Sequence, residues 1–436
     1  MAAAGSRFRR KRLSAAMSMA TQYSRGTERK RRVLYVDTAP TAGGSVISLY
    51  ELLRGLDRSR YEPIVLVYTP HAYVDRLLAL GLDVVVWNVH AAQDYRPAWV
   101  TEAREFAPVH WLRQRAWGST VYHAVGFAVM LGRRVWPRAR ALRRIVDQKR
   151  IELLHTNIRV GHDREGILAA KMAGIPCVCH IRDFEQLNWF DEKLAGMVDS
   201  FIYISEAVQR SHLQAGISRG KGRVVYNAVD TTAFSGVLDT ARQRRGLDLA
   251  DDDLAVGIVG RLERWKGQEV FLRAMALVRD RMPNVKGVVI GDPVPYDMDY
   301  GNTLLALRHE LGLSDQVVFS SFRQDMPAVM SALDLLVLAS TSPEPFGRVL
   351  IEAMAAAKPV VATDSGAVRE IVEDRVHGLL VPPGDVQALA GAIVYILTHR
   401  DLAAAMGRKG QARVREHFSV QQYVEGVQAV YRDLLP

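Results

Sequence analysis

The stretch Ala255-Val-Gly-Ile-Val-Gly260, followed by Arg261-Leu-Glu-Arg-Trp-Lys266-Gly267, decides the fold. An apolar run that ends in glycine is typical of a strand buried on both faces, as in a parallel sheet. The glycine lets a ligand approach the backbone closely. Similar runs recur before and after this stretch and alternate with helical patterns. Such alternation predicts a parallel sheet covered by helices on both faces.

The expected strands form two groups. The first group is Val33–Asp37, Ile64–Tyr68, Val84–Val89, Glu152–Asn157, Cys177–Arg182 and Ser200–Ser205. The second group is Ala255–Gly260, Val285–Gly291, Gln316–Phe322, Leu333–Ser340, Pro359–Thr363 and Gly378–Val381. Two doubly wound units in tandem place a ligand crevice at the carboxyl ends of their strands. The predicted fold class is therefore α/β, with two Rossmann-like domains that face each other across a cleft.

A chain of 436 residues suits two domains better than one. The expected divisions are a disordered basic tail at 1–32, a first domain at 33–225, a second domain at 226–418 and a final helix at 419–436. A basic, aromatic insertion at 91–150 interrupts the first domain, and the connection between domains lies near Asn227–Phe234. For residues 1–32, a transit peptide and a true start at Met17 or Met19 are the alternatives.

The net charge of +10 is unevenly spread. Residues 1–32 carry +9 and residues 106–150 another +9, which leaves −8 for the rest of the chain. This segregation fits docking on an anionic surface better than a nucleic-acid groove through the fold. No window approaches the roughly 18 uninterrupted apolar residues of a membrane span. A soluble or peripheral protein that does not bind nucleic acid is therefore expected.

The insertion places aromatic side chains among its arginines, namely Phe106, Trp111, Trp117, Tyr122, Phe127 and Trp136. This pattern fits an amphipathic segment that lies in a membrane interface. It fits equally an ordinary helical insertion that packs on the sheet and exposes a basic face. Both interpretations stay open.

The most informative stretch for chemistry is Ser342-Pro-Glu344-Pro-Phe-Gly347-Arg-Val-Leu-Ile-Glu352. A loop ends a strand there and a helix begins, and the first N–H groups of a helix favour an anion. Glu344 precedes the helix and Glu352 lies within it, so two carboxylates can accept hydrogen bonds from hydroxyls at two ends of one ligand. In the earlier stretch, Arg261 and Lys266 can hold a diphosphate and stabilise the charge that grows on it as a bond breaks.

These segments resemble the retaining nucleotide-sugar glycosyltransferases of family 4, which have the GT-B fold. The family's Glu-x7-Glu is matched by Glu344 and Glu352, and its Gly-Arg-x4-Lys-Gly by Gly260, Arg261, Lys266 and Gly267. Further matches are the Gly43-Gly44 loop, the hinge Asn227-Ala-Val-Asp230 and the stretch Thr363-Asp-Ser-Gly366-Ala-Val-Arg-Glu370. Several matches in family order are a strong signal.

The resemblance implies roles for the matching residues. Catalytic roles fall to His180, Glu344, Arg261 and Lys266, and nucleotide-binding roles to Gly43, Gly44, Gly260, Arg261, Lys266, Phe346, Gly347, Arg348, Val349 and Glu352. Within this set, Arg261 and Lys266 would bind the diphosphate, Glu352 the ribose and Glu344 the donor sugar. For His180 the alternative is a structural histidine whose hydrogen bonds are satisfied. The pair Asp297 and Asp299 does not directly end an apolar strand, so no metal site is predicted.

The resemblance also implies an activity. The donor would be a UDP- or GDP-linked sugar held by the second domain, and the acceptor a hydroxyl held by the first, with the final helix packing back on the first domain. Family members retain the anomeric configuration without a metal or another cofactor, and an oxygen of the leaving diphosphate is the usual proposed base. The basic insertion favours a lipid-linked or cell-envelope acceptor and a cytoplasmic protein that is peripheral on the inner face of the membrane.

Three alternatives belong to other functional classes. A nucleotide-sugar epimerase or a phosphorylase uses the same double-Rossmann scaffold, because fold does not fix chemistry. A nucleic-acid-binding protein would follow from the two basic patches alone. A non-catalytic membrane-docking partner would not need the Arg261/Lys266 and Glu344/Glu352 pairs that the chain retains.

Overall fold

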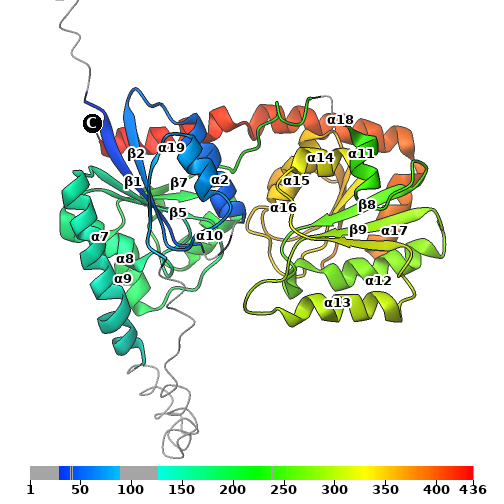
Figure 1. The fold of residues 1–436 in the computed structure, drawn as a ribbon, viewed down its shortest axis with the longest axis horizontal. Helices are drawn as coiled ribbons and strands as arrows, with labels where there is room; N and C mark the ends of the chain where they lie inside the picture. The colour runs from blue at the N-terminus through cyan, green and yellow to red at the C-terminus, as the bar shows by residue number, and fades with distance from the viewer. Residues whose placement is uncertain (1–28, 40, 42, 89–125, 237–238, 436) are drawn as a thin grey trace, which may run out of the picture.

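Two parallel sheets, one in each half of the chain, form the frame of the molecule (Figure 1). The computed structural model describes residues 29–39, 41, 43–88, 126–236 and 239–435. The first sheet has seven strands in the order β3-β2-β1-β4-β5-β6-β7, and the second has six in the order β10-β9-β8-β11-β12-β13. Both sheets carry helices on their faces, which confirms the predicted fold class of two Rossmann-like domains.

The strands of the first sheet are β1 Arg31–Asp37, β2 Tyr61–Val67, β3 Asp83–Val86, β4 Leu153–Thr156, β5 Cys177–Ile181, β6 Ser200–Tyr203 and β7 Gly222–Val224. Its helices are α2 Gly44–Gly55, α3 Val74–Ala79, α7 Trp136–Lys149, α8 Arg164–Ala173, α9 Trp189–Met197 and α10 Glu206–Gln214. The edge strand β7 was not expected from the sequence.

The strands of the second sheet are β8 Leu254–Val259, β9 Val285–Ile290, β10 Val317–Ser320, β11 Leu335–Leu338, β12 Val360–Thr363 and β13 Gly378–Val381. Its helices are α11 Thr240–Arg245, α12 Gln268–Arg279, α13 Asp299–Glu310, α14 Met326–Ala332, α15 Arg348–Ala355, α16 Val368–Ile371, α17 Val386–Thr398 and α18 Arg400–His417. All paired strands of both sheets run parallel, with the apolar β8 and β11 at the centre of the second.

The start of β1 corrects the expected end of the basic tail. Arg31 and Arg32, assigned to the tail by composition, pair with β2 and begin the strand. Their guanidinium groups lie 3.0 Å from the carboxylates of Glu152 and Glu62, respectively, on the neighbouring segments. Acidic side chains on the neighbouring segments therefore pair with both arginines and offset their charge at the start of a buried strand. The rest of the predicted tail, residues 1–28, lies outside the described residues.

The last helix, α19 (Val420–Leu434), returns to the first domain and lies beside α2 (Figure 1). Its amphipathic sequence buries Tyr423, Val427 and Tyr431 against the first sheet. The Tyr431 hydroxyl donates to Tyr35 Oη at 3.1 Å. A capping box between Ser419 and Gln422 fixes the first turn of the helix.

The chain crosses between the domains twice, and the two crossings touch. Val229, on the first crossing, forms a parallel bridge with Ser419, on the second. The Val229 N–H donates to the carbonyl of Phe418 at 3.0 Å. Further contacts hold the domains together, among them a 2.7 Å hydrogen bond from Ser205 Oγ to the Pro345 carbonyl. The Glu370 carboxylate accepts the backbone N–H groups of Glu206 and Ala207 at the start of α10, where a helix favours negative charge.

The basic insertion is described only from residue 126. Residues 126–130 are helical, and a π-helical segment, Leu131–Val135, joins them to α7. Of its six predicted aromatic side chains, Phe106, Trp111, Trp117 and Tyr122 lie outside the described residues. No single described helix is long and apolar enough to cross a membrane; one pair, Val386–Thr398 with Arg400–His417, meets that test together but is bent by 99°.

Candidate functional site

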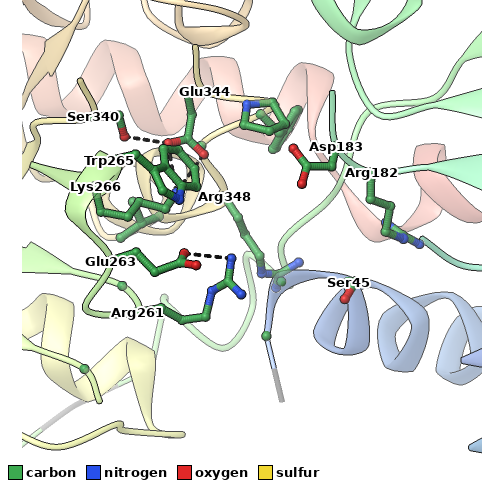
Figure 2. A pocket seen from close by; sticks show the side chains of 18 of the residues that line it. Ser45, Arg182, Asp183, Arg261, Glu263, Trp265, Lys266, Ser340, Glu344 and Arg348 are labelled. Carbon is green, nitrogen blue, oxygen red and sulfur yellow. Dashed lines mark hydrogen bonds and ion pairs between the residues drawn. The ribbon is translucent and has the colours of Figure 1, made fainter. Parts of the chain in front are cut away.

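A cavity of about 1530 Å³ lies between the two domains (Figure 2). Its lining comes from the loops that follow β1, β4 and β5 in the first domain and β8, β9 and β11 in the second, together with α10 and the start of α15. Sites for single small ligands measure about 300–1,000 Å³. The cavity is thus large enough for more than one substrate, at the position that two facing doubly wound sheets predict.

The centre of the second-domain wall is an ion pair between Lys266 and Glu344. Lys266 Nζ lies 3.0 and 2.9 Å from the two carboxylate oxygens, and Ser340 Oγ donates to Glu344 Oε2 at 2.7 Å. Lys266 Nζ also lies 3.9 Å from the centre of the Trp265 ring. The side chain of Glu344 is 6% exposed and that of Lys266 is 21% exposed. The two predicted residues are therefore held together and face the cavity.

Two glycines explain why the loops approach so closely. Gly267 has φ +74, and a Cβ atom there would lie 1.9 Å from the carbonyl oxygen of Ala339. Gly366 has φ +65, and its Cβ would lie 2.2 Å from the carbonyl oxygen of Glu344. Any other residue at these positions would push the lysine loop or the glutamate loop away. The Lys-Gly and Ser-Gly sequences thus position the ion pair.

Arg261 lines the same wall but has its own acid. Its guanidinium lies 3.0 Å from Glu263, whose carboxylate also accepts the hydroxyl of Tyr296. The Arg261 side chain is 46% exposed to the cavity. The arginine can therefore turn toward an anion without leaving a deeply buried position.

The start of α15 contributes mainly backbone and one arginine. Phe346, Gly347, Arg348 and Val349 all line the cavity. The Phe346 ring is buried against Tyr226 and Phe418, so little of its side chain is accessible. On the opposite wall, Gly43 and Gly44 stand at the start of α2 and line the cavity. Gly260, which directly follows β8, lines it on the second-domain side.

Glu352 is not among the described residues that line the cavity. Its carboxylate accepts a 2.8 Å hydrogen bond from Arg348 Nε, one helical turn earlier. Burial raises the pKa of Glu352, and Arg348 opposes the rise. Arg348 also donates to the carbonyl of Ala228, in the connection between the domains, at 2.9 Å. Contact between Glu352 and a ribose therefore requires a rearrangement of this ion pair, and that role stays a prediction.

The structure does not bring His180 into the cavity, which corrects its predicted catalytic placement. His180 is part of β5 and its ring is fully buried. Its Nδ1 atom lies 3.3 Å from Nε2 of His155 and 3.3 Å from the guanidinium of Arg182. Burial, Arg182 and His155 hold the pKa of His180 well below its ordinary value. Its ring lies beside that of Tyr423 on α19, 6.2 Å between centres. Its Nε2 is buried without a hydrogen-bond partner, so the alternative of a structural histidine with satisfied hydrogen bonds holds only at Nδ1. The catalytic role of His180 stays a prediction.

The two residues that directly follow β5, Arg182 and Asp183, do line the cavity, and neither was predicted as a site residue. Arg182 and Asp183 stand two and three positions after His180 in the same quoted run. Figure 2 shows Asp183 projecting from the first domain toward Glu344 and Lys266. The available signal was position, because side chains at the carboxyl end of a parallel strand reach the crevice.

Within the described part of the chain, no three His, Cys, Asp or Glu side chains come together as a metal site. The Asp297 carboxylate of the Asp297-Met-Asp299 stretch is held 3.0 Å from Arg264 Nε. The metal-independent chemistry implied by the resemblance stays a prediction.

Each half of the chain matches a glycosyltransferase family model. Residues 42–233 match the model of Glycosyltransferase Family 4, and residues 239–413 match the model of Glycosyl transferases group 1. The crystal structure of Anabaena Alr3699/HepE in complex with UDP and glucose has a TM-score of 0.75 to this chain at 26% sequence identity. The match covers 93% of this chain and 100% of that one.

Curated relatives match over shorter stretches. The lipopolysaccharide core biosynthesis mannosyltransferase LpsB of Rhizobium meliloti (strain 1021) is 30% identical over 214 residues, which are 49% of this chain and 61% of LpsB. The D-inositol 3-phosphate glycosyltransferase of Corynebacterium urealyticum is 30% identical over 289 residues, which are 64% of this chain and 66% of that protein. The chain thus spans less than two thirds of the length of either relative. The two family matches and the shared architecture show that the chain belongs to the family 4 type of GT-B glycosyltransferases.

Proposed function

We propose that this chain transfers a sugar from a UDP- or GDP-linked donor to a hydroxyl acceptor, with retention of anomeric configuration and without a metal ion. The observation that carries the proposal is the Lys266–Glu344 ion pair, with Arg261 beside it on the second-domain wall of the cavity. Further support comes from HepE, whose structure matches along its whole length and contains UDP and glucose.

The wall supplies what loss of a nucleoside diphosphate requires. Negative charge grows on the diphosphate as its bond to the sugar breaks, and fixed cations in a site of low polarity stabilise that charge. Arg261 and Lys266 are those cations. Glu344 is held by Lys266 and Ser340, so its buried carboxylate is oriented to accept hydrogen bonds from sugar hydroxyls. When Lys266 binds the diphosphate, Glu344 keeps its hydrogen bond from Ser340 and can share the lysine with the diphosphate.

We propose a cell-envelope polysaccharide or glycolipid as the acceptor class. The name of LpsB, a mannosyltransferase of lipopolysaccharide core biosynthesis, supports this class, as does the basic, aromatic composition of the insertion in the first-domain sequence. The proposed place of action is the cytoplasmic face of the cell membrane.

The first test is a donor screen. Thermal shift with UDP, GDP and their sugars identifies the nucleotide, and release of free nucleotide then measures turnover. We expect Arg261→Ala to lower turnover by about 100-fold, as for loss of a preorganised charge contact. The matched control is Arg415→Ala, an exposed arginine near the end of α18. Near-normal turnover of Arg261→Ala would contradict the assignment, and a converted nucleotide sugar without transfer would identify an epimerase instead.

We also propose that the face around 126–149 and α9 docks on anionic lipid. Exposed apolar side chains stand there beside exposed arginines: Val129 is 46%, Trp136 43% and Trp189 61% exposed, and Arg140 lies over the Trp136 ring at 5.3 Å. Aromatic and cationic side chains together favour the headgroup region of a membrane.

Flotation with phosphatidylglycerol vesicles tests the docking face. The double variant Trp136→Ser/Trp189→Ser should bind the vesicles more weakly, because it loses its exposed indoles, and donor hydrolysis should stay unchanged. The control Tyr395→Ser removes an aromatic side chain that is 37% exposed on the second domain. Equal vesicle binding by the double variant and the wild type would refute the proposal. Binding to DNA in place of vesicles would favour the nucleic-acid alternative.

A further inference from the structure

Arg348, the first residue of α15, connects three parts of the molecule. Within the second domain, its Nε donates to Glu352 Oε1 at 2.8 Å. Its Nη1 donates to the carbonyl of Ala228, in the connection between the domains, at 2.9 Å, and to the Ser48 hydroxyl of α2, in the first domain, at 3.3 Å. Figure 2 shows the arginine reaching from the second domain toward the start of α2. One side chain thus holds a residue of each domain and the connection between them.

The same arginine separates Glu352 from the cavity. Arg348 lines the cavity and is bonded to Glu352, which is not among the described residues that line it. The two side chains are only 14% and 8% exposed. A ligand in the cavity therefore reaches the Glu352 carboxylate only where it replaces the guanidinium. A vicinal diol, such as that of ribose, suits such a replacement, because its two hydroxyls can donate to one carboxylate.

Arg348 also has an acid near it in the first domain. Burial raises the pKa of Glu51 on α2, and the charges of Arg54 and Arg348 oppose that rise. The Arg54 guanidinium lies 2.9 Å from the Glu51 carboxylate and 2.7 Å from that of Asp230, in the connection. Arg348 thus stands between acids of both domains. When it leaves Glu352, the charge of Glu51 still stabilises it, so the exchange does not strand a buried cation.

We propose that Arg348 is a positioning residue that competes with the ribose of the donor for the Glu352 carboxylate; this role rests on the proposed function. In the structure, Arg348 holds Glu352 and, through Ser48, the helix that begins at Gly44 in the glycine loop. Ribose hydroxyls that donate to Glu352 displace the contact of the arginine Nε. Arg348 then turns toward Ser48, and its contacts with the second domain pass to the first. Binding of the nucleoside is thereby coupled to the contact between the domains.

The preference for a ribonucleotide over its deoxyribonucleotide measures this competition, because the diphosphate contacts are the same for both. The probes are UDP with dUDP and GDP with dGDP, and calorimetric titration gives each Kd at about pH 8, which keeps the carboxylate ionised. In the wild type the 2′-hydroxyl gains Glu352 only as Arg348 loses it, so we expect a preference of about threefold or less. In Arg348→Gln no cation competes, and the preference should rise to about tenfold or more, as for a hydrogen bond to a charged group.

A second variant and a control complete the experiment. Arg348→Lys keeps a charge but replaces the separate Nε and Nη1 donors by one ammonium group, so its preference should lie between those of the wild type and Arg348→Gln. The control Arg415→Gln changes an exposed arginine near the end of α18 and should bind as wild type. A preference equal to that of the wild type in each Arg348 variant that folds, or a wild-type preference above about 20-fold, would overturn the role. A wild type that binds none of the nucleotides would overturn the proposed function itself.

Discussion

Removal of the Lys266 ammonium group should weaken both the fold and the activity of the second domain. In Lys266→Ala the Glu344 carboxylate keeps only the 2.7 Å hydrogen bond from Ser340 Oγ among its side-chain contacts. Breaking a buried ion pair costs about 3–5 kcal/mol because one charge stays behind without its partner. Glu344 is 6% exposed but Lys266 is 21% exposed, and solvent screens part of the loss. We therefore expect a loss of about 2–3 kcal/mol in the free energy of unfolding.

For a domain of this size, such a loss corresponds to a fall in Tm of about 4–12 °C. Differential scanning calorimetry measures the shift, and nucleotide release measures turnover, which should fall by about 100- to 1,000-fold. The control Lys409→Ala removes an exposed lysine of α18 and should change neither quantity. The double variant Lys266→Ala/Glu344→Gln should recover at least about 1 kcal/mol, because the stranded charge is gone. Additive losses in the double variant would refute the reasoning.

Three further predictions concern the supports of the site. Gly267→Ala should destabilise the second domain by about 2 kcal/mol or more, since its Cβ would meet the Ala339 carbonyl. Gly391→Ala, in open space on α17, should raise Tm slightly in the same calorimetric scan. Burial raises the pKa of Asp163 to about 7; the folded state therefore binds a proton that the unfolded state releases, and stability should fall as pH rises from about 4 toward 7. Urea unfolding across that range should show a smaller fall in Asp163→Asn. His180→Phe should lower Tm but leave the kcat of the remaining folded protein within about threefold of wild type; a larger loss of kcat would restore His180 to the mechanism.

The frame of the molecule was predictable because it depends on local patterns. Each apolar run expected from the sequence overlaps a strand; Gly378–Val381 matches at both ends, and no other end differs by more than three residues. The edge strand β7 was missed because Gly222-Arg-Val224 offers only three residues, one apolar, and pairs on one side only. Such an edge strand is stabilised by pairing with the adjacent strand, and the local sequence does not reveal that pairing.

The site was predictable where function depends on loop glycines and charges, and less so where it depends on side-chain direction. Lys266 and Glu344 meet because two glycine loops bring their backbones together. His180 lies outside the cavity because its ring is buried in the interior of the first domain, and in this part of the chain the residues just beyond β5 reach the crevice. The Arg348–Glu352 ion pair follows the four-residue spacing of neighbours on one helix face, so the sequence alone carries a signal for it.

The doubled connection between the domains has a mechanical consequence. Val229 and Ser419 belong to segments separated by almost half the chain, yet they run in the same direction and are bonded to each other. Two hydrogen-bonded segments side by side allow the domains to bend relative to each other in one plane but resist a twist of one domain against the other. Opening of the cleft should therefore return the same pairs of residues to face each other on every closure. Loss of the Val229–Ser419 contact alone would free that alignment, while α19 would keep its place in the core of the first domain.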